Sequence, residues 1–247
     1  MYHEIARNGS LDGHFAVVER DFHAQMRRIV ELGVIGTSLE DIVQNQGSGV
    51  AITFDDAHRS VHERAAPILD SLKLRATIFV VTSWVGRPDY CSWEQLRELA
   101  SAGHSIQSHT HTHPFLSTLS SRAVREELVS SKARIEGALG VPVTSLALPN
   151  GDAPRGWSID DYQTLGYDTV GTSVWGPNGH GRHFVRRYTV RRATRLNSFD
   201  SLITASSSAW SGEGVRLRVL ATIRGALGVE RYARWRRRIV HSPWSPG

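Results

Sequence analysis

The sequence has little cysteine and no long apolar run, and both absences narrow what the protein can be. Cys91 is the single cysteine among 247 residues, so no disulfide can form within the chain, which suits a reducing compartment. No apolar stretch approaches the ~20 residues that cross a bilayer. The first residues, MYHEIARNG, lack the basic and apolar regions of a signal peptide. We therefore expect a cytoplasmic globular protein.

Acidic residues are scarce at the carboxyl end of the chain. Eight arginines and two glutamates lie after residue 212, which leaves residues 1–212 with a net charge of −1 in a chain of net charge +5. The basic character belongs to a tail, so we expect no nucleic-acid-binding core. Residues 215–240 have the pattern of a basic amphipathic helix. Such a helix either packs on the main body or attaches the protein to anionic lipid, as a peripheral membrane protein, or to an acidic glycan.

Strand patterns alternate with helix patterns along most of the chain. The predicted strands are residues 1–5, 50–54, 76–81, 105–109, 141–148, 167–174 and 183–192. This alternation predicts a parallel sheet, and the most economical closure is a distorted (β/α) barrel of seven strands. We assign residues 1–212 to this barrel and residues 213–247 to a basic amphipathic extension. Nothing in the pattern indicates an oligomeric state.

Helix boundaries have sequence signals of their own. Thr37 with Glu40 predicts a capping box for a short helix, and Ser92 with Gln95 predicts the same for the helix over 93–103. The helix over 60–74 should be disturbed at Pro67. Residues 15–33 are predicted as one helix.

The segment VAITFDDAH, residues 50–58, ends an apolar strand in two adjacent carboxylates. Successive strand residues point to opposite faces, so Asp55 and Asp56 can serve one site only if the strand ends there. Ala57 follows, and alanine resists positive φ, so the turn must avoid that region or accept strain. In parallel α/β proteins the carboxyl ends of strands collect the chemistry.

The segment SHTHTHP carries three alternating histidines, His109, His111 and His113. Histidines at i and i+4 share a helical face, and those at i and i+2 share a strand face, so a pair is available in either conformation. Two imidazoles with Asp56 would give a two-histidine, one-carboxylate metal site. Such a set leaves coordination positions open for water and substrate, as hydrolytic sites require.

TFDDA followed by SHTHTHP resembles the first two motifs of the polysaccharide deacetylases, the family 4 carbohydrate esterases with a NodB-homology domain. The likeness spans roughly residues 1–205. The resemblance implies a metal-dependent N-deacetylase in which Asp55 is the catalytic base and Asp56, His109 and His113 bind one divalent cation. Zn²⁺ is the first choice for that cation, with Co²⁺ or Ni²⁺ as alternatives. His111 would be a neighbour of the metal and not a ligand.

The resemblance also suggests how the site is completed. LALPNGD would be the third motif, where the backbone N–H of Asn150 is the first donor after Pro149, although relatives commonly carry an aromatic residue at Asn150. Arg187 matches an arginine that would orient Asp55. The general acid is either His3, in a version with an amino-terminal YH strand, or His241, and we choose His3.

Four tryptophans are candidates for stacking on sugar rings: Trp84, Trp93, Trp157 and Trp175. We choose Trp175 as the substrate contact, because it lies in a loop rich in glycine and proline. The function we predict is removal of acetyl groups from an N-acetylated amino sugar in a glycan or glycan precursor. Two rivals remain open: a metal-dependent amidase acting on a non-sugar amide or cyclic imide, and a catalytically silent glycan-binding protein. Neither the sugar nor its length follows from the sequence.

Overall fold

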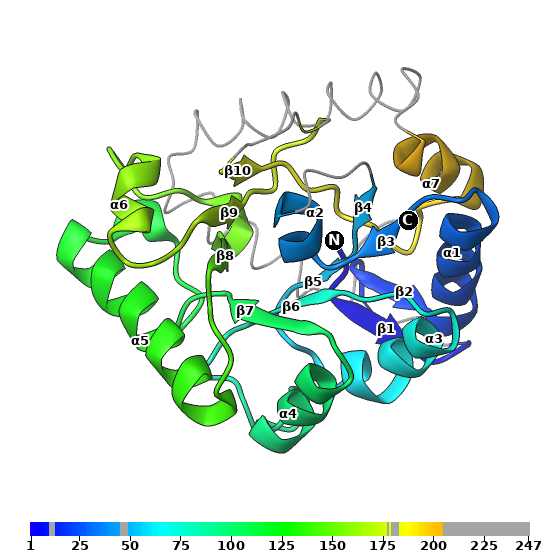
Figure 1. Ribbon diagram of the computed structural model, residues 1–247, viewed down its shortest axis with the longest axis horizontal. Coiled ribbons are helices and arrows are strands. Elements are labelled where there is room, and N and C mark those ends of the chain that lie inside the picture. The colour runs from blue at the N-terminus through cyan, green and yellow to red at the C-terminus, as the bar shows by residue number, and fades with distance from the viewer. Residues whose placement is uncertain (10–12, 45–48, 177, 179–182, 205–247) are drawn as a thin grey trace.

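A six-stranded parallel sheet forms the centre of the molecule (Figure 1). The computed structural model describes residues 1–9, 13–44, 49–176, 178 and 183–204. The strands lie side by side in chain order: β5 (Thr53–Phe54), β6 (Thr77–Val80), β7 (Ser105–Ser108), β8 (Ser145–Ala147), β9 (Thr169–Gly171) and β10 (Phe184–Val185). Because all six run the same way, their carboxyl ends meet at one edge. The predicted α/β fold built on a parallel sheet is therefore confirmed.

The first residues of the chain lie against both edges of this sheet. Tyr2 pairs with Phe54 as an isolated parallel bridge, in which the Tyr2 N–H donates to the Thr53 carbonyl at 2.8 Å and the Asp55 N–H donates to the Tyr2 carbonyl at 2.9 Å. On the other side, the Val190 N–H donates to the Met1 carbonyl at 2.9 Å. The expected count of seven strands is not confirmed, because the described part of this sheet has six.

Two pairs of short parallel strands flank the main sheet. They are β1 (Glu4–Ala6) with β2 (Ala16–Val18), and β3 (Gly36–Thr37) with β4 (Val50–Ala51). Strand β2 corrects the prediction of one helix over 15–33, because its β-branched residues pair with β1 and the helix α1 begins only at Glu19.

Helices connect the strands, and most of them lie around the outside of the sheet, whereas α2 lies at its inner side and packs there through Leu39 (Figure 1). They are α1 (Glu19–Glu31), α2 (Leu39–Gln44), α3 (Ala66–Ser71), α4 (Trp93–Ser101), α5 (Ser121–Leu139), α6 (Ile159–Gln163) and α7 (Leu196–Ile203). A π turn (Val61–Ala65) precedes α3, so the helix is irregular immediately before Pro67, as predicted. The capping box of Ser92 and Gln95 on α4 is confirmed.

The structure shows an N-cap at Ser38 and not the capping box predicted at Thr37 and Glu40. The Asp41 N–H donates to the Ser38 hydroxyl at 3.1 Å, and that hydroxyl donates to the Asp41 carboxylate at 2.7 Å. Glu40 instead accepts a hydrogen bond from the Thr77 hydroxyl at 2.6 Å. The helix α2 is therefore fixed to the sheet through Glu40 and capped through Ser38.

The core has a large outer part and a small inner part. The outer part lies between sheet and helices and includes Phe22, Phe54 and Ile78, all fully buried. The inner part joins Leu39 of α2 to Phe79, Ala147 and Val185 of three strands. No described helix has the length and apolar character needed to cross a membrane. The predicted basic extension, the boundary at residue 212 and His241 all lie outside the described residues.

Candidate active site

Strand β5 ends at Phe54, and the next residues turn through an unusual backbone conformation. Asp56 has a φ of 70° and Ala57 a φ of 53°, the left-handed region that favours glycine. Of the two outcomes expected for Ala57, the turn has taken the strained one, and Ala57 is buried there. Such a conformation costs on the order of 1–3 kcal/mol, and the surrounding structure must enforce it.

The same strain recurs in two other loops that carry predicted site residues. Thr110 and His113, after β7, have φ values of 68° and 61°, and Asn150, after β8, has a φ of 57°. In the described part of the chain, Lys73 is the one further non-glycine residue with positive φ. Strained backbone is therefore concentrated at the carboxyl edge of the sheet, a pattern typical of functional sites.

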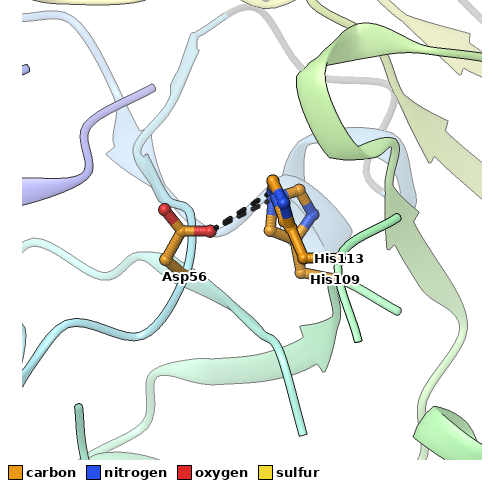
Figure 2. A group of neighbouring side chains, drawn as sticks. All are labelled: Asp56, His109 and His113. Atoms are coloured by element: carbon orange, nitrogen blue, oxygen red, sulfur yellow. Dashed lines mark ion pairs between the residues drawn. The ribbon is translucent and has the colours of Figure 1, made fainter. Parts of the chain in front are cut away.

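Asp56, His109 and His113 converge at this edge, as the sequence predicted (Figure 2). The Asp56 Oδ1 atom lies 3.5 Å from His109 Nε2 and 3.6 Å from His113 Nε2. One potential ligand atom from each residue lies within 4.8 Å of the other two. Asp56 Oδ1 is buried and has no hydrogen-bond partner among the described residues. A buried, unpaired carboxylate oxygen facing two imidazole nitrogens suits a divalent cation such as zinc.

His109 is held in the orientation that a metal ligand needs. Its Nδ1 lies 2.8 Å from the Ala147 carbonyl at the end of β8. A carbonyl oxygen can only accept, so Nδ1 carries the hydrogen, and in the neutral ring Nε2 presents its lone pair towards Asp56. The neighbouring strand thus selects the tautomer that can bind a cation.

His113 and His111 have different surroundings. Burial, followed by the nearby His109, lowers the pKa of His113 to about 4, so this imidazole is neutral near pH 7. The His113 ring packs against the Trp84 indole, with 5.2 Å between ring centroids. The His111 Nδ1 instead lies 2.8 Å from the Thr82 hydroxyl, and His111 does not belong to the group formed by Asp56.

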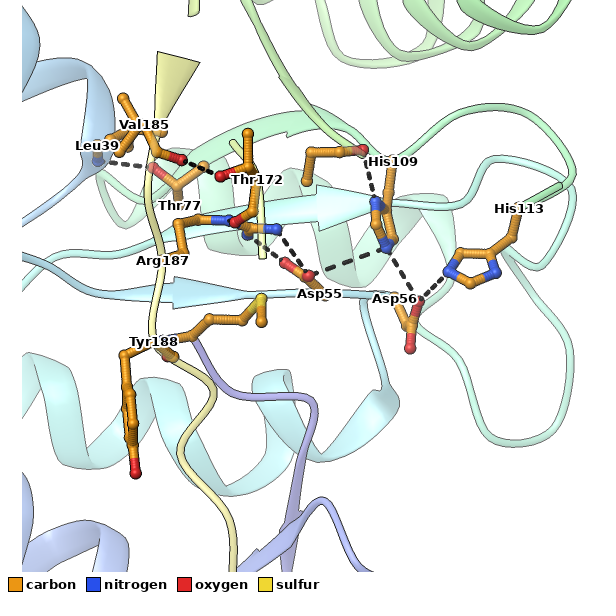
Figure 3. A network of polar contacts seen from close by, with 12 residues as sticks. Leu39, Asp55, Asp56, Thr77, His109, His113, Thr172, Val185, Arg187 and Tyr188 are labelled. Atoms are coloured by element: carbon orange, nitrogen blue, oxygen red, sulfur yellow. Dashed lines mark hydrogen bonds and ion pairs between the residues drawn. The ribbon is translucent and has the colours of Figure 1, made fainter. Parts of the chain in front are cut away.

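Asp55 forms a buried ion pair with Arg187 (Figure 3). The guanidinium donates from Nη1 to Asp55 Oδ1 at 2.6 Å and from Nη2 to Oδ2 at 3.0 Å, and the two residues are 6% and 3% exposed. Burial alone would raise the pKa of Asp55, but the charges of Arg187 and then His109 oppose it and hold that pKa well below its usual range. Asp55 is therefore ionised at neutral pH and fixed in orientation.

The surroundings of Arg187 leave room for this pair. The guanidinium lies over the Phe79 ring at 5.0 Å, and its Nε donates to the Thr172 carbonyl at 3.2 Å. A Cβ atom at Gly171 would lie 2.8 Å from that Nε. Glycine at the end of β9 is thus a steric requirement of the Asp55–Arg187 pair.

His3 lies next to the paired residue Tyr2 and interacts electrostatically with both aspartates. Burial lowers the pKa of His3, while the charges of Asp56 and Asp55 act in the opposite direction. Its ring packs against Phe15 at 4.9 Å, and its Nδ1 is buried without a hydrogen-bond partner among the described residues. The fold therefore brings His3 to the same edge as Asp55.

Asn150 and Trp175 occupy neighbouring loops. Asn150 lies in a 3₁₀ turn (Pro149–Gly151), where a Cβ atom at Gly151 would lie 2.7 Å from the Ser173 side chain. Trp175 packs against Tyr188 at 5.6 Å. The ring of Trp84, another of the four candidate tryptophans, packs on His113, a contact that the sequence did not predict.

The sequence is similar to those of several known proteins. A family model described as polysaccharide deacetylase matches residues 43–170, just over half of the chain. A putative polysaccharide deacetylase of Bacillus subtilis is 28% identical over 158 residues, which cover 61% of this chain and 55% of that protein. A chitooligosaccharide deacetylase of Rhizobium leguminosarum bv. trifolii is 30% identical over 145 residues, 51% of this chain and 64% of the relative.

The fold also has a solved counterpart. A Streptococcus pyogenes deacetylase, solved in complex with acetate, superimposes with a TM-score of 0.72 at 23% identity, over 80% of this chain and 93% of that one. The chain spans about half the length of the Bacillus relative. The family model covers the strands that carry Asp55, Asp56, His109 and His113, and the chain belongs to the polysaccharide deacetylase family.

Proposed function

We propose that this protein is a metal-dependent N-deacetylase that hydrolyses the acetamide of an N-acetylated amino sugar in a glycan or glycan precursor. The observation that carries the proposal is the convergence of Asp56, His109 and His113 beside a separately paired Asp55. The name of the Rhizobium relative supports an N-acetylated sugar as the substrate class.

Asp56, His109 and His113 would hold one divalent cation, with Zn²⁺ favoured by two imidazoles and a carboxylate and Co²⁺ or Ni²⁺ as alternatives. A cation bound there would lower the pKa of water and polarise the acetamide carbonyl. The buried Asp56 Oδ1 has no competing donor among the described residues, and the His109 tautomer is already selected.

Asp55 would take a proton from the attacking water. Arg187 holds both of its oxygens, which fixes the direction of proton transfer. The same pairing keeps the pKa of Asp55 low and makes it a weak base, so orientation rather than basicity is its main contribution.

The remaining roles follow the order of the reaction. Attack of water on the amide carbon forms a tetrahedral oxyanion, which the backbone N–H of Asn150 would stabilise. Collapse of this species then breaks the C–N bond and releases acetic acid and the amine, whose nitrogen would take its proton from protonated His3. Trp175 would contact the sugar from its loop.

Acetate release from N-acetylglucosamine oligomers tests the activity, using protein stripped with a chelator and then reloaded with zinc. We expect release only after reloading. Acetate release restricted to non-sugar amides would favour the amidase alternative. Binding of zinc and sugar without acetate release would favour a glycan-binding protein.

The metal assignment has a matched pair of variants. His113→Ala should lose most bound zinc, whereas His111→Ala should retain it, because His111 faces Thr82. Metal content measured after dialysis checks both. The opposite result would move the ligand role from His113 to His111.

A further inference from the structure

The loop between the two predicted metal histidines is attached to helix α5 through one carboxylate. Glu127 Oε2 accepts hydrogen bonds from the backbone N–H of His111 at 3.0 Å and of Thr112 at 2.8 Å. Its Oε1 accepts from the Thr112 hydroxyl at 2.7 Å. All three donors lie between His109 and His113, so Glu127 holds the loop that sets the spacing of these two rings.

Ser131, four residues later on α5, attaches the beginning of the same loop. Its hydroxyl accepts a hydrogen bond from Ser108 at 2.8 Å, and the Ser108 hydroxyl accepts one from the Thr110 N–H at 3.2 Å. Residues four apart share one helix face, so α5 presents Glu127 and Ser131 to the loop together.

The loop needs such attachment because its backbone is strained. Thr110 and His113 both have positive φ, a backbone region that non-glycine residues rarely adopt. Within the loop, the His113 N–H donates to the Thr110 hydroxyl at 3.0 Å. Without Glu127, the two N–H groups at His111 and Thr112 would lose their acceptor, and the loop could relax towards unstrained conformations that turn His113 away from Asp56.

We propose that Glu127 is a positioning residue for the metal site, which keeps His113 Nε2 facing Asp56 without contacting the cation. The proposal rests on the metal binding proposed for Asp56, His109 and His113. Replacing a residue that orients a metal ligand typically weakens metal affinity by about 10- to 100-fold.

Glu126, the preceding residue on α5, is a matched control. Its carboxylate pairs with Arg122 at 2.9 Å, and both side chains are exposed. Replacing either glutamate removes the same charge from the same helix, but only Glu127 touches the histidine loop.

The experiment measures the Kd for zinc of the full chain by competition with a chromophoric chelator, together with the melting temperature of the metal-free protein. We expect Glu127→Ala to weaken zinc binding about 10- to 100-fold and Glu126→Ala to leave it unchanged. Glu127→Gln should restore most of the affinity, because the amide oxygen can accept from both N–H groups while its NH₂ donates to the Thr112 hydroxyl.

Thr112→Val gives a second variant if Glu127→Ala does not fold. It removes one of the three hydrogen bonds and should weaken zinc binding by a smaller factor. A lower melting temperature with an unchanged zinc Kd in Glu127→Ala would overturn the positioning role. A wild-type protein that binds no zinc would overturn the metal site itself, which separates the two failures.

Discussion

Asp55 and Asp56 are consecutive, yet their carboxylates lie in two regions of opposite character. The Asp55 region is closed, because Arg187 occupies both oxygens of a buried carboxylate. The Asp56 region is open, because a buried oxygen faces two imidazoles and has no hydrogen-bond donor among the described residues. The strained turn at Asp56 and Ala57 separates the two side chains. Two adjacent carboxylates can therefore have opposite surroundings when one of them already has a cationic partner.

Asp55→Asn tests the closed region with the largest expected effect. Asparagine cannot take the proton from water, so kcat should fall by about 10²- to 10⁴-fold while zinc affinity is retained. Arg187 would lose its charged partner, which can destabilise the fold by about 3–5 kcal/mol. Acetate release and the zinc Kd should therefore be measured at a temperature where circular dichroism shows the variant folded. Full activity in that variant would remove Asp55 from the mechanism.

Arg187→Met leaves Asp55 in place and removes its partner. We expect kcat to fall by about 10²-fold, because orientation is lost. Burial is then unopposed by Arg187, so the pKa of Asp55 should rise. Only ionised Asp55 accepts a proton, and the acidic limb of the kcat/KM profile should therefore move to higher pH.

Arg186→Met is the control for Arg187→Met, because Arg186 is exposed and adjacent in sequence. It should leave both kcat and the pH profile near those of the wild type. An Arg187→Met profile that coincides with the wild type would show that the ion pair does not control Asp55.

The pH dependence of stability separates the two regions in the metal-free protein. Burial, followed by His109, lowers the pKa of His113 from 6.5 to about 4. The unfolded chain then binds more protons, so the free energy of unfolding should fall as the pH decreases from 6.5 to 4, by up to about 3 kcal/mol from this ring. The stabilisation that comes from the lowered pKa of Asp55 is complete above the ordinary pKa of 3.8, and it should be lost only as the pH falls below that value.

Urea unfolding at pH 7 and pH 5 measures this effect. His113→Gln should reduce the difference between the two pH values, and His111→Gln serves as the control because His111 lies outside the Asp56 group. An identical pH dependence in wild type and His113→Gln would contradict the prediction that burial of His113 lowers its pKa and makes stability depend on pH.

The sequence predicted which loops meet, because parallel strands bring their carboxyl ends to one edge. The position of Arg187 opposite Asp55 came from family resemblance, since no local pattern links residues so far apart. Glu127 was missed because helix spacing does not say which of two adjacent glutamates faces a loop. The cap of α2 was predicted one residue too early for a similar reason. The sequence allows Thr37 to cap the helix with Glu40, or Ser38 to cap it with Asp41. The contact of Glu40 with Thr77 decides between these two possibilities.

Trp84→Ala has the smallest expected effect. It tests whether the Trp84 ring, next to the Asp56 region, contacts the sugar. Trp84 is partly exposed, and its ring centroid lies 4.9 Å from that of Tyr90 and 5.2 Å from that of His113. If its free face stacks on the sugar, KM should rise about 3- to 10-fold with little change in kcat, the size of one aromatic contact. Trp157→Ala is the control, because Trp157 packs on Tyr162 and Arg125. A higher Kd for zinc with an unchanged KM would instead show that Trp84 supports the His113 ring and so affects metal binding.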